Sequence, residues 1–245
     1  MHNKIKEAAD ALRKSKKTIA FTGAGISVES GIPSFRGKDG IWNKYDPKYL
    51  EISYFFTDPI NSWKVIKEIF FDHFGEAKPN AAHYFLAELE KQNLLKAIIT
   101  QNIDNLHQEA GSKHVIEFHG NTRQLICMDC GEIYGRKTVY EQDIPICNSC
   151  HGLLKPDFIF FGEAIPEPAG SDSFRLALEA DVVIIIGSTG EVMPACNVPY
   201  YAKQNGATII EINPEASNFS DKITDIFLQG KAGDIADLLL KELQS

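Results

Sequence analysis

Four cysteines in the middle of the chain have the spacing of a metal site. Two residues separate Cys127 from Cys130 and Cys147 from Cys150, and 16 residues lie between the two pairs. A two-residue spacing lets one tight turn present both thiolates to a tetrahedral ion, and two such pairs are typical of a structural zinc ribbon. Because sulfur would fill all four coordination positions, the predicted zinc has no open position for chemistry. The fifth cysteine, Cys196, is expected to pack in the core.

His119 is the residue best suited to transfer a proton. It ends a predicted strand and is followed by Gly120, whose missing side chain lets another group come close. Histidine titrates near neutral pH and can act there as a general base. A single histidine is more often structural, so this motif alone leaves both interpretations open. His83, His107 and His114 lack this setting, and we expect them on helix surfaces or in packing contacts.

A run of polar side chains follows another predicted strand. Gln101, Asn102, Ile103 and Asp104 come directly after the strand expected at residues 97–100. Parallel α/β sheets bind their ligands at the carboxyl ends of their strands, and amides beside a carboxylate suit a ribose or a carboxamide. An ordinary helix N-cap formed by Asn102 or Asp104 would explain the same residues.

A glycine loop follows the first predicted strand, at residues 18–22. Gly23, Ala24 and Gly25 stand where phosphate-binding loops occur, and a following helix would offer free N–H groups to a diphosphate. A structural turn is the alternative. The dinucleotide pattern G-x-G-x-x-G is not met, because Val28 replaces its third glycine, and no strand with an acidic end follows about 20 residues later. The sequence therefore argues against a hydride-transferring oxidoreductase.

The elements that must position these residues alternate along the chain. Strands are predicted at residues 18–22, 97–100, 115–118, 181–187, 207–212 and 223–228, and helices at residues 3–15, 59–73, 81–92, 173–180, 194–205 and 233–243. Near-continuous aliphatic strands between helices predict the α/β class, with a doubly wound parallel sheet covered on both faces. The predicted large domain comprises residues 1–34, 81–121 and 158–245. The remaining residues, 35–80 and 122–157, leave the alternation and are expected to form a second, smaller, helical and zinc-binding lobe.

The charge balance bears on possible partners. The net charge is −8, from 33 acidic and 25 basic residues, so nucleic acid is not an expected partner. The longest aliphatic run, at residues 182–186, is too short to span a membrane, and the N-terminus lacks the apolar segment of a secretory signal. We therefore expect a cytoplasmic protein with no membrane partner, in which cysteines serve a metal site better than disulfides.

Together, these motifs resemble in content and order the sirtuin family, in its bacterial and archaeal form with a single catalytic core. The matching segments are Gly23-Ala24-Gly25-Ile26-Ser27, Gly31-Ile32-Pro33-Ser34-Phe35-Arg36-Gly37, Thr100-Gln101-Asn102-Ile103-Asp104-Asn105-Leu106-His107, Phe118-His119-Gly120, the four cysteines, Phe161-Gly162-Glu163, Gly187-Ser188 and Ile212-Asn213. The resemblance covers nearly the whole chain. It implies an NAD-dependent protein-lysine deacylase, in which a Rossmann-like large domain binds NAD as co-substrate and the small lobe holds one structural Zn²⁺.

The resemblance also implies a reaction. The acyl oxygen of a modified lysine on a protein substrate would attack C1′ of the nicotinamide ribose, releasing nicotinamide and forming an alkylamidate. His119 would then act as general base on a ribose hydroxyl that attacks the amidate carbon, with Asn102 as the second catalytic residue. Water would complete the reaction to free lysine and 2′-O-acyl-ADP-ribose.

Site residues follow from the same resemblance. Along NAD, Phe35 would cover the reacting ribose, Arg36 would hold the diphosphate side, and Ile103 with Asp104 would hold the carboxamide. The full NAD set is Gly23, Ala24, Gly25, Ser27, Phe35, Arg36, Gln101, Asn102, Ile103, Asp104, Gly187, Ser188, Thr189, Asn213 and Ala232. The substrate peptide would lie as a β-strand in a slot between two edges, formed by Phe160, Phe161, Gly162 and Glu163 on one side and by Glu191 and Val192 on the other.

Two departures from the family pattern concern substrate choice. Where many sirtuins continue with aliphatic residues, Thr189 is followed here by Gly190 and Glu191. An unpaired carboxylate at a slot edge attracts positive charge, so Glu191 is expected to favour basic residues near the target lysine. Sirtuins that prefer succinyl or malonyl groups carry a Tyr-x-x-Arg pair that residues 63–70 lack. Without that guanidinium an acidic acyl group has no partner, so an acetyl or longer neutral acyl group is expected.

Two other functions fit parts of the pattern. A mono-ADP-ribosyltransferase on the same scaffold would also release nicotinamide, but it would not need an acylated peptide. A non-catalytic binding module would use the zinc ribbon to contact a partner. The presence of both His119 and Asn102 argues against such an inactive protein.

Overall fold

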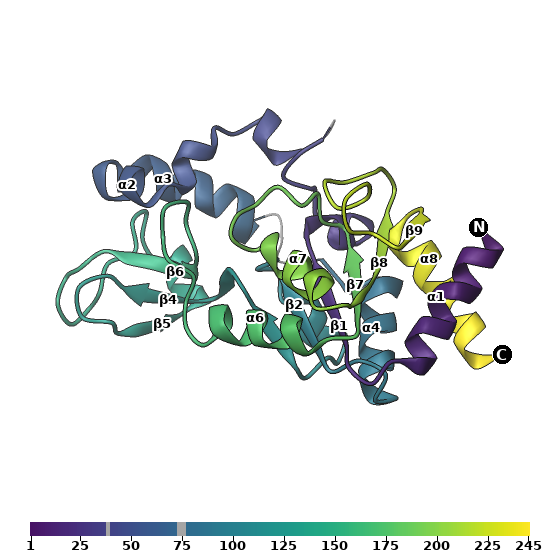
Figure 1. Ribbon diagram of the computed structural model, residues 1–245. Coiled ribbons are helices and arrows are strands. Elements are labelled where there is room, and N and C mark those ends of the chain that lie inside the picture. Colours follow the sequence, from purple (N-terminus) through teal and green to yellow (C-terminus); the bar gives the residue numbers. More distant parts are fainter. Residues whose placement is uncertain (38–39, 73–76) are drawn as a thin grey trace.

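The parallel sheet predicted from the sequence forms the centre of the molecule. The structure is a computed structural model that describes residues 1–37, 40–72 and 77–245 (Figure 1). Within these residues the sheet consists of β1 (Thr18–Thr22), β2 (Ala97–Thr100), β3 (Val115–Glu117), β7 (Val182–Ile186), β8 (Thr208–Asn213) and β9 (Ile226–Gln229). All are parallel, in the order β3-β2-β1-β7-β8-β9. The order reverses between β1 and β7, and such a switch point opens a crevice at the carboxyl ends of the strands.

Helices cover both faces of this sheet, as the buried aliphatic strands require. On one face lie α1 (His2–Lys14), α4 (Ala81–Lys91) and α8 (Ala232–Gln244), and on the other α6 (Ala169–Glu179) and α7 (Asn197–Gln204) (Figure 1). Successive side chains of a strand point to opposite faces, so the neighbours Ile184 and Ile185 enter different hydrophobic clusters. The doubly wound fold predicted from the sequence is confirmed.

A smaller lobe lies beside the sheet (Figure 1). An antiparallel sheet in the order β5-β4-β6, formed by β4 (Gly120–Cys127), β5 (Ile133–Gly135) and β6 (Leu154–Phe158), packs against α2 (Ile52–Thr57) and α3 (Pro59–Ile66). The Trp63 indole N–H donates to the carbonyl of Leu154 at 3.1 Å. The two segments that leave the helix–strand alternation therefore share one core, while the residue boundaries of the two domains remain a prediction.

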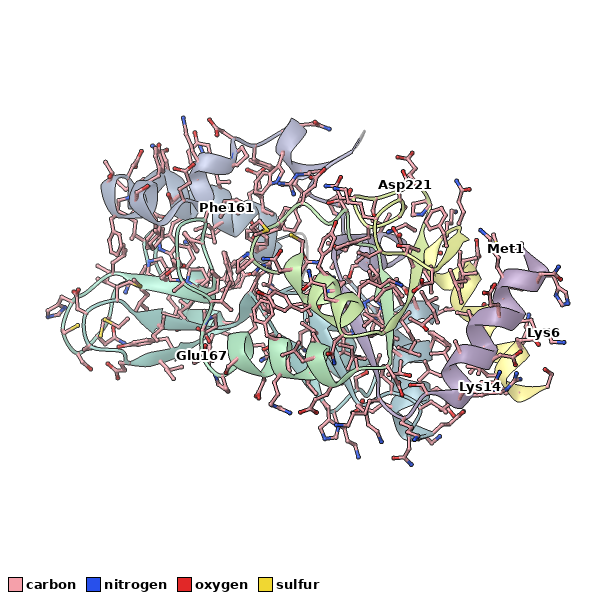
Figure 2. All side chains as sticks on the ribbon, in the orientation of Figure 1. Met1, Lys6, Lys14, Phe161, Glu167 and Asp221 are labelled. Atoms are coloured by element: carbon pink, nitrogen blue, oxygen red, sulfur yellow. The ribbon has the colours of Figure 1, made fainter. Side chains whose placement is uncertain are left out.

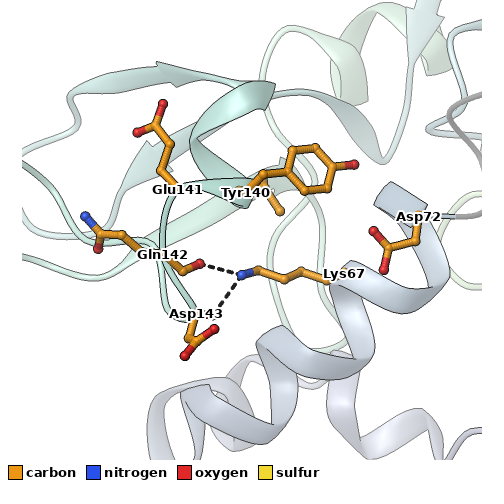
Figure 3. Close-up of a pocket in the computed structure, with 7 residues that line it drawn as sticks. Lys67, Asp72, Tyr140, Glu141, Gln142 and Asp143 are labelled. Carbon is orange, nitrogen blue, oxygen red and sulfur yellow. Dashed lines mark hydrogen bonds between the residues drawn. The ribbon is translucent and has the colours of Figure 1, made fainter.

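Lys67 forms a second contact between the helical and the cysteine-bearing segments of the small lobe. Lys67 begins a π-helical turn, Lys67–Asp72, and its Nζ donates to the carbonyls of Gln142 at 2.5 Å and Asp143 at 2.9 Å. Figure 3 shows this contact at a pocket that Tyr140 also lines. The pocket lies within the small lobe, and the Lys67 ammonium that lines it makes two hydrogen bonds to backbone carbonyls of the protein.

Several element boundaries differ from the prediction. The helix expected at residues 59–73 changes to π-helix after Ile66, and residue 73 lies outside the described residues. Helix α6 begins earlier, at Ala169, and α7 begins only at Asn197, because turns occupy residues 193–196. Strand β9 begins at Ile226 rather than at residue 223, after turns.

Short helices complete the structure. They are the 3₁₀ helices at Ala24–Ser30, Ile41–Asn43, Pro47–Leu50 and Arg136–Tyr140, and the single α-helical turn α5 at Leu106–Glu109. A helix was expected after the glycine loop and, as an alternative, after Asn102 or Asp104. The other short helices and α2 were not predicted, since elements of one or two turns carry no readable hydrophobic period. In the described part of the chain, every helix is too short or too polar to cross a membrane.

Candidate active site

A cleft of about 780 Å³ opens at the carboxyl ends of β1, β2 and β7, a size typical of small-molecule sites. The predicted site residues that line it are Gly23, Ala24, Gly25, Phe35, Arg36, Gln101, Asn102, Ile103, His119, Phe160, Phe161, Gly162, Glu163, Gly187, Ser188, Thr189, Val192, Asn213 and Ala232. Ser27, Asp104 and Glu191 are not part of this lining. Ser27 is bonded to Asn102 and to Asp104, and Glu191 is paired with Arg36. The fold thus brings together segments that lie far apart in the sequence.

The glycine loop is shaped by contact with a second loop. Gly187 has a φ of +66°, and a Cβ there would come 2.2 Å from the backbone nitrogen of Ile26. A Cβ on Gly25 would come 2.6 Å from the Cα of Gly187, and the Gly25 N–H donates to the Gly187 carbonyl at 2.9 Å. The loop continues as a short 3₁₀ helix. A helix thus follows the glycine loop as expected, but the Gly25 N–H is bonded to Gly187 and is not one of the free N–H groups that were expected there.

Side chains at three strand ends are joined across the cleft floor. The Gln101 amide, after β2, donates to the Ser188 hydroxyl, after β7, at 2.9 Å. Asn213, which ends β8, donates to the Ser188 carbonyl at 3.2 Å. These bonds fix the spacing of three segments that line the cleft.

Glu211 holds Asn213 in this arrangement, a role that the sequence did not predict. Its fully buried carboxylate accepts hydrogen bonds from Asn213 at 2.9 Å and from the hydroxyls of Ser217, Ser220 and Thr224 at 2.5, 2.9 and 2.6 Å. An acidic residue inside an aliphatic strand was the available signal, because such a residue is buried only with several donors.

Asn102 is held rigidly beneath the cleft. Its side-chain amide donates to the Gly23 carbonyl and to the Ser27 hydroxyl, both at 3.2 Å. Ser27 in turn donates to Asp104 at 2.7 Å, and Asp104 accepts the Leu106 N–H at 3.0 Å. Burial raises the pKa of the Asp104 carboxyl. Asp104 therefore accepts the first N–H of the short helix α5, but the N-cap residue of this helix is Asn105, so the alternative N-cap at Asn102 or Asp104 is wrong.

Two of the remaining histidines are buried beside this network. Nε2 of His107 lies 2.9 Å from the Thr22 hydroxyl, and Nε2 of His83 lies 3.5 Å from the Ser27 hydroxyl. Burial lowers the pKa of His83 to about 4. Their expected packing role is confirmed, whereas His114 is exposed and contacts the largely buried carboxylate of Glu90.

His119 has the geometry of a general base. Its Nδ1 lies 3.0 Å from the carbonyl oxygen of Gln101. Because a carbonyl can only accept, the shared proton sits on Nδ1 and Nε2 keeps a free lone pair. Burial lowers the pKa of His119, so the ring is neutral near pH 7. Gly120, with a φ of +73°, leaves room for the Asp157 carbonyl, which would lie 2.3 Å from a Cβ there.

The edge expected to pair with a peptide is partly occupied. The Phe161 N–H donates to the Leu50 carbonyl at 2.8 Å, and the Phe161 carbonyl accepts the Ile52 N–H at 3.0 Å. In Figure 2, Phe161 lies close to the helices of the small lobe. Both backbone groups of Phe161 are thus used within the protein. Within the described part of the chain, the Gly162 backbone and the Glu163 carbonyl have no such hydrogen bond and form the open part of this edge.

Glu191 is not an unpaired carboxylate, and that premise of the sequence analysis is wrong. Its Oε2 lies 2.9 Å from Nε of Arg36, and both side chains are more than two-fifths exposed. The expectation failed because the partner comes from a loop far away in the sequence.

An apolar wall on the small-lobe side of the cleft was not predicted. Phe35 packs on Trp42 with ring centres 5.3 Å apart, and Phe70 packs on Phe158 at 5.0 Å. Leu50 continues the wall. Three of these five residues lie in irregular segments or short turns, where the sequence shows no periodicity that would mark them as a group.

The four cysteines converge as predicted. Their sulfur atoms all lie within 4.8 Å of one another, with Cys127 3.4 Å from Cys150 and Cys130 3.6 Å from Cys147. Zn–S bonds of about 2.3 Å in a tetrahedron place sulfurs roughly 3.8 Å apart, so this cluster fits a structural zinc ion. Cys196 is buried elsewhere, in the core, as expected.

Comparisons with a family model and with curated relatives point to the same family. The Sir2 family model matches residues 23–194. An NAD-dependent protein deacylase of Pyrococcus furiosus is 47% identical over 97% of both chains. NAD-dependent protein deacylase 2 of Archaeoglobus fulgidus is 42% identical over 100% of this chain and 98% of its own.

Solved structures agree with this similarity. A Sir2 enzyme with a histidine-to-alanine change, holding a deacetylated peptide and 3′-O-acetyl ADP-ribose, has a TM-score of 0.93 and 38% identity, covering 97% of this chain and 98% of that one. Another, bound to a propionylated peptide, has a TM-score of 0.89 and 36% identity over the same shares. With the cleft, the histidine and the cysteine cluster in place, the chain belongs to the Sir2 family.

Proposed function

We propose that this chain removes acetyl or other neutral acyl groups from lysine side chains of proteins and consumes NAD in the reaction. One observation carries the proposal: a single cleft joins the glycine loop, the amides of Gln101 and Asn102, the imidazole of His119 and the edge at Gly162. Full-length relatives at 40 to 47% identity bear the names NAD-dependent protein deacylase or deacetylase.

NAD would extend along the strand ends. The adenosine half would lie against Gly187, Ser188, Thr189, Asn213 and Ala232, which all line the cleft. Arg36, Ala24 and Gly25 would flank the diphosphate. Gln101 and Asn102 would orient the ribose hydroxyls, Phe35 would cover the ribose, and Ile103 and Asp104 would hold the carboxamide. The dinucleotide supplies the electrophilic C1′ and the nicotinamide leaving group.

His119 would provide the proton transfer that the reaction needs. His119 lines the cleft, and because its Nδ1 is bonded to the Gln101 carbonyl, the Nε2 lone pair would be the one that accepts the proton. The imidazole would accept the proton of a ribose hydroxyl, which then attacks the acyl carbon. A neutral ring is required for this step, and burial favours the neutral form.

The substrate peptide would enter between Gly162 and Val192, both of which line the cleft. Pairing through the backbone accommodates many sequences. Among the described residues that line the cleft, only Arg36 and Lys231 carry a fixed positive charge, and Arg36 is paired with Glu191. The wall formed by Trp42 and its neighbours is apolar. A neutral acyl group therefore suits the cleft better than succinyl or malonyl.

Mass spectrometry of NAD incubated with acylated peptides tests the proposal. Acetyl-lysine and longer neutral acyl-lysine peptides should yield nicotinamide, free lysine and 2′-O-acyl-ADP-ribose, whereas succinyl-lysine should react slowly. ADP-ribose attached to protein, without any need for an acylated peptide, would identify a transferase instead. If neither NAD nor any peptide in a broad panel changes, the proposed function is wrong.

A further inference from the structure

Lys155 is a buried cation whose three N–H donors all have acceptors within the protein. It belongs to β6 and is only 4% exposed. Its ammonium group donates to the carbonyls of Pro156 at 3.0 Å and Phe158 at 2.6 Å, and to the carboxylate of Glu163 at 3.1 Å. A lysine ammonium has three donors, and all three are satisfied. A buried charge is tolerated only with such complete pairing.

Glu163 connects this cation to a tight turn. The same carboxylate oxygen accepts the Phe160 N–H at 2.6 Å, and the Glu163 N–H donates to the Phe160 carbonyl at 3.1 Å. The Lys155 ammonium also lies 4.6 Å from the centre of the Phe160 ring, within the range of a cation–π contact. The turn from residue 160 to 163 is thus closed by backbone and side chain together, with Lys155 beneath it.

The turn is part of the cleft wall and lies next to the proposed base. Residues 158–163 all line the cleft, and Gly162 carries the open part of the peptide edge. The Ile159 N–H donates to the His119 carbonyl at 2.8 Å. The segment anchored by Lys155 therefore runs directly from the backbone of His119 to the edge where the peptide would pair.

We propose that Lys155 and Glu163 form a positioning pair, which holds the turn at residues 160–163 in the shape that receives the acylated-lysine peptide. The proposal rests on the function proposed above and deepens it. Neither side chain needs to touch the reacting atoms: Glu163 acts through the position of the turn, and its carboxylate points inward rather than toward a peptide. Loss of the pair should weaken peptide use while ADP-ribose binding, whose proposed adenosine contacts at Ser188, Asn213 and Ala232 lie outside this turn, stays intact.

Steady-state kinetics with an acetyl-lysine peptide test this proposal. In Lys155→Met and Glu163→Gln we expect the peptide KM to rise about tenfold or more, because a displaced turn loses productive peptide geometry. The dissociation constant for ADP-ribose should change less than about twofold. Lys155→Arg keeps the charge and several donors, and it should restore most of the peptide KM. Lys203→Met is the matched control, since it removes an exposed lysine–aspartate pair outside the cleft and should leave both values unchanged.

Hydrogen–deuterium exchange provides a readout that does not depend on turnover. The Phe160 amide is bonded to the Glu163 carboxylate, so it should exchange faster in both variants, while amides of β1 and β7 keep their protection. Faster exchange across the whole chain would indicate a general folding defect and would contradict a positioning role. If the wild type turns over no acylated peptide, the proposed function fails. If it does, and both variants keep the wild-type peptide KM and Phe160 exchange, only the positioning pair is refuted.

Discussion

The imidazole Nδ1 of His119 and the carbonyl oxygen of Gln101 lie 3.0 Å apart. The same Gln101 donates through its side chain to Ser188, and its backbone N–H donates to the carbonyl of Thr22. One residue thus orients the proposed base and ties it to two neighbouring strand ends. Because the strands form the rigid centre of the fold, the free Nε2 of His119 is held in place before any substrate binds.

Replacing His119 with alanine should abolish deacylation without unfolding the protein. General-base assistance contributes on the order of 10² to 10⁴ in rate, so we expect kcat/KM for an acetyl-lysine peptide to fall by about three orders of magnitude. ADP-ribose binding and the melting temperature should remain close to wild type. His114→Ala is the control, since that side chain is 72% exposed and is not among the described residues that line the cleft. Activity of His119→Ala within tenfold of wild type would refute the assigned base.

The pH profile should reflect the burial of His119. Its pKa lies below the ordinary 6.5, because burial disfavours the charged ring. The base is active when neutral, so kcat/KM should fall as the pH drops through this lowered pKa, and the midpoint of that loss should lie below 6.5. Activity measured across pH 4 to 8, with the ring titrated by NMR in parallel, checks this sign. A midpoint above 6.5 would mean that another group limits the reaction.

Removal of the metal should unfold the small lobe. Structural zinc contributes directly to folding, so Cys147→Ala or a strong chelator should remove the bound zinc and lower the melting temperature sharply. Cys196→Ala provides a matched control, because that thiol is also buried but lies outside the cluster, and it should keep its zinc and lose only about 1–2 kcal/mol of unfolding free energy. A Cys147→Ala protein that melts like wild type without zinc would contradict a structural role.

Glu191 should affect peptide choice only weakly, because Arg36 already neutralises it. An exposed ion pair is worth up to about 1 kcal/mol, so a basic peptide residue can compete with Arg36 for the carboxylate. We expect wild type to prefer Lys/Arg flanks over Asp/Glu flanks, and Glu191→Gln to reduce that ratio by roughly two- to fivefold. Matched peptides differing only in their flanks measure the ratio. An unchanged ratio in Glu191→Gln removes this residue from the slot's specificity.

Much of the molecule follows from local patterns. The aliphatic runs predicted the strands, because a strand buried on both faces must be apolar throughout. The two cysteine pairs predicted their cluster, since each pair needs only one tight turn to present its thiolates. His119 and Gln101 were both assigned to strand ends, and the parallel sheet places such ends at one edge.

What the sequence by itself determined is the set of residue types and their order along the strands: a doubly wound sheet, four metal-binding thiols and polar groups at strand ends. Only the tertiary structure decided which partner each group has. The Arg36–Glu191 and Lys155–Glu163 pairs, the buried Glu211 and the pairing of Phe161 with Leu50 and Ile52 all depend on contacts between segments. The physical reason is that strand and turn propensities act between neighbours, whereas a charge or backbone group is satisfied by whatever the fold brings within about 3 Å of it.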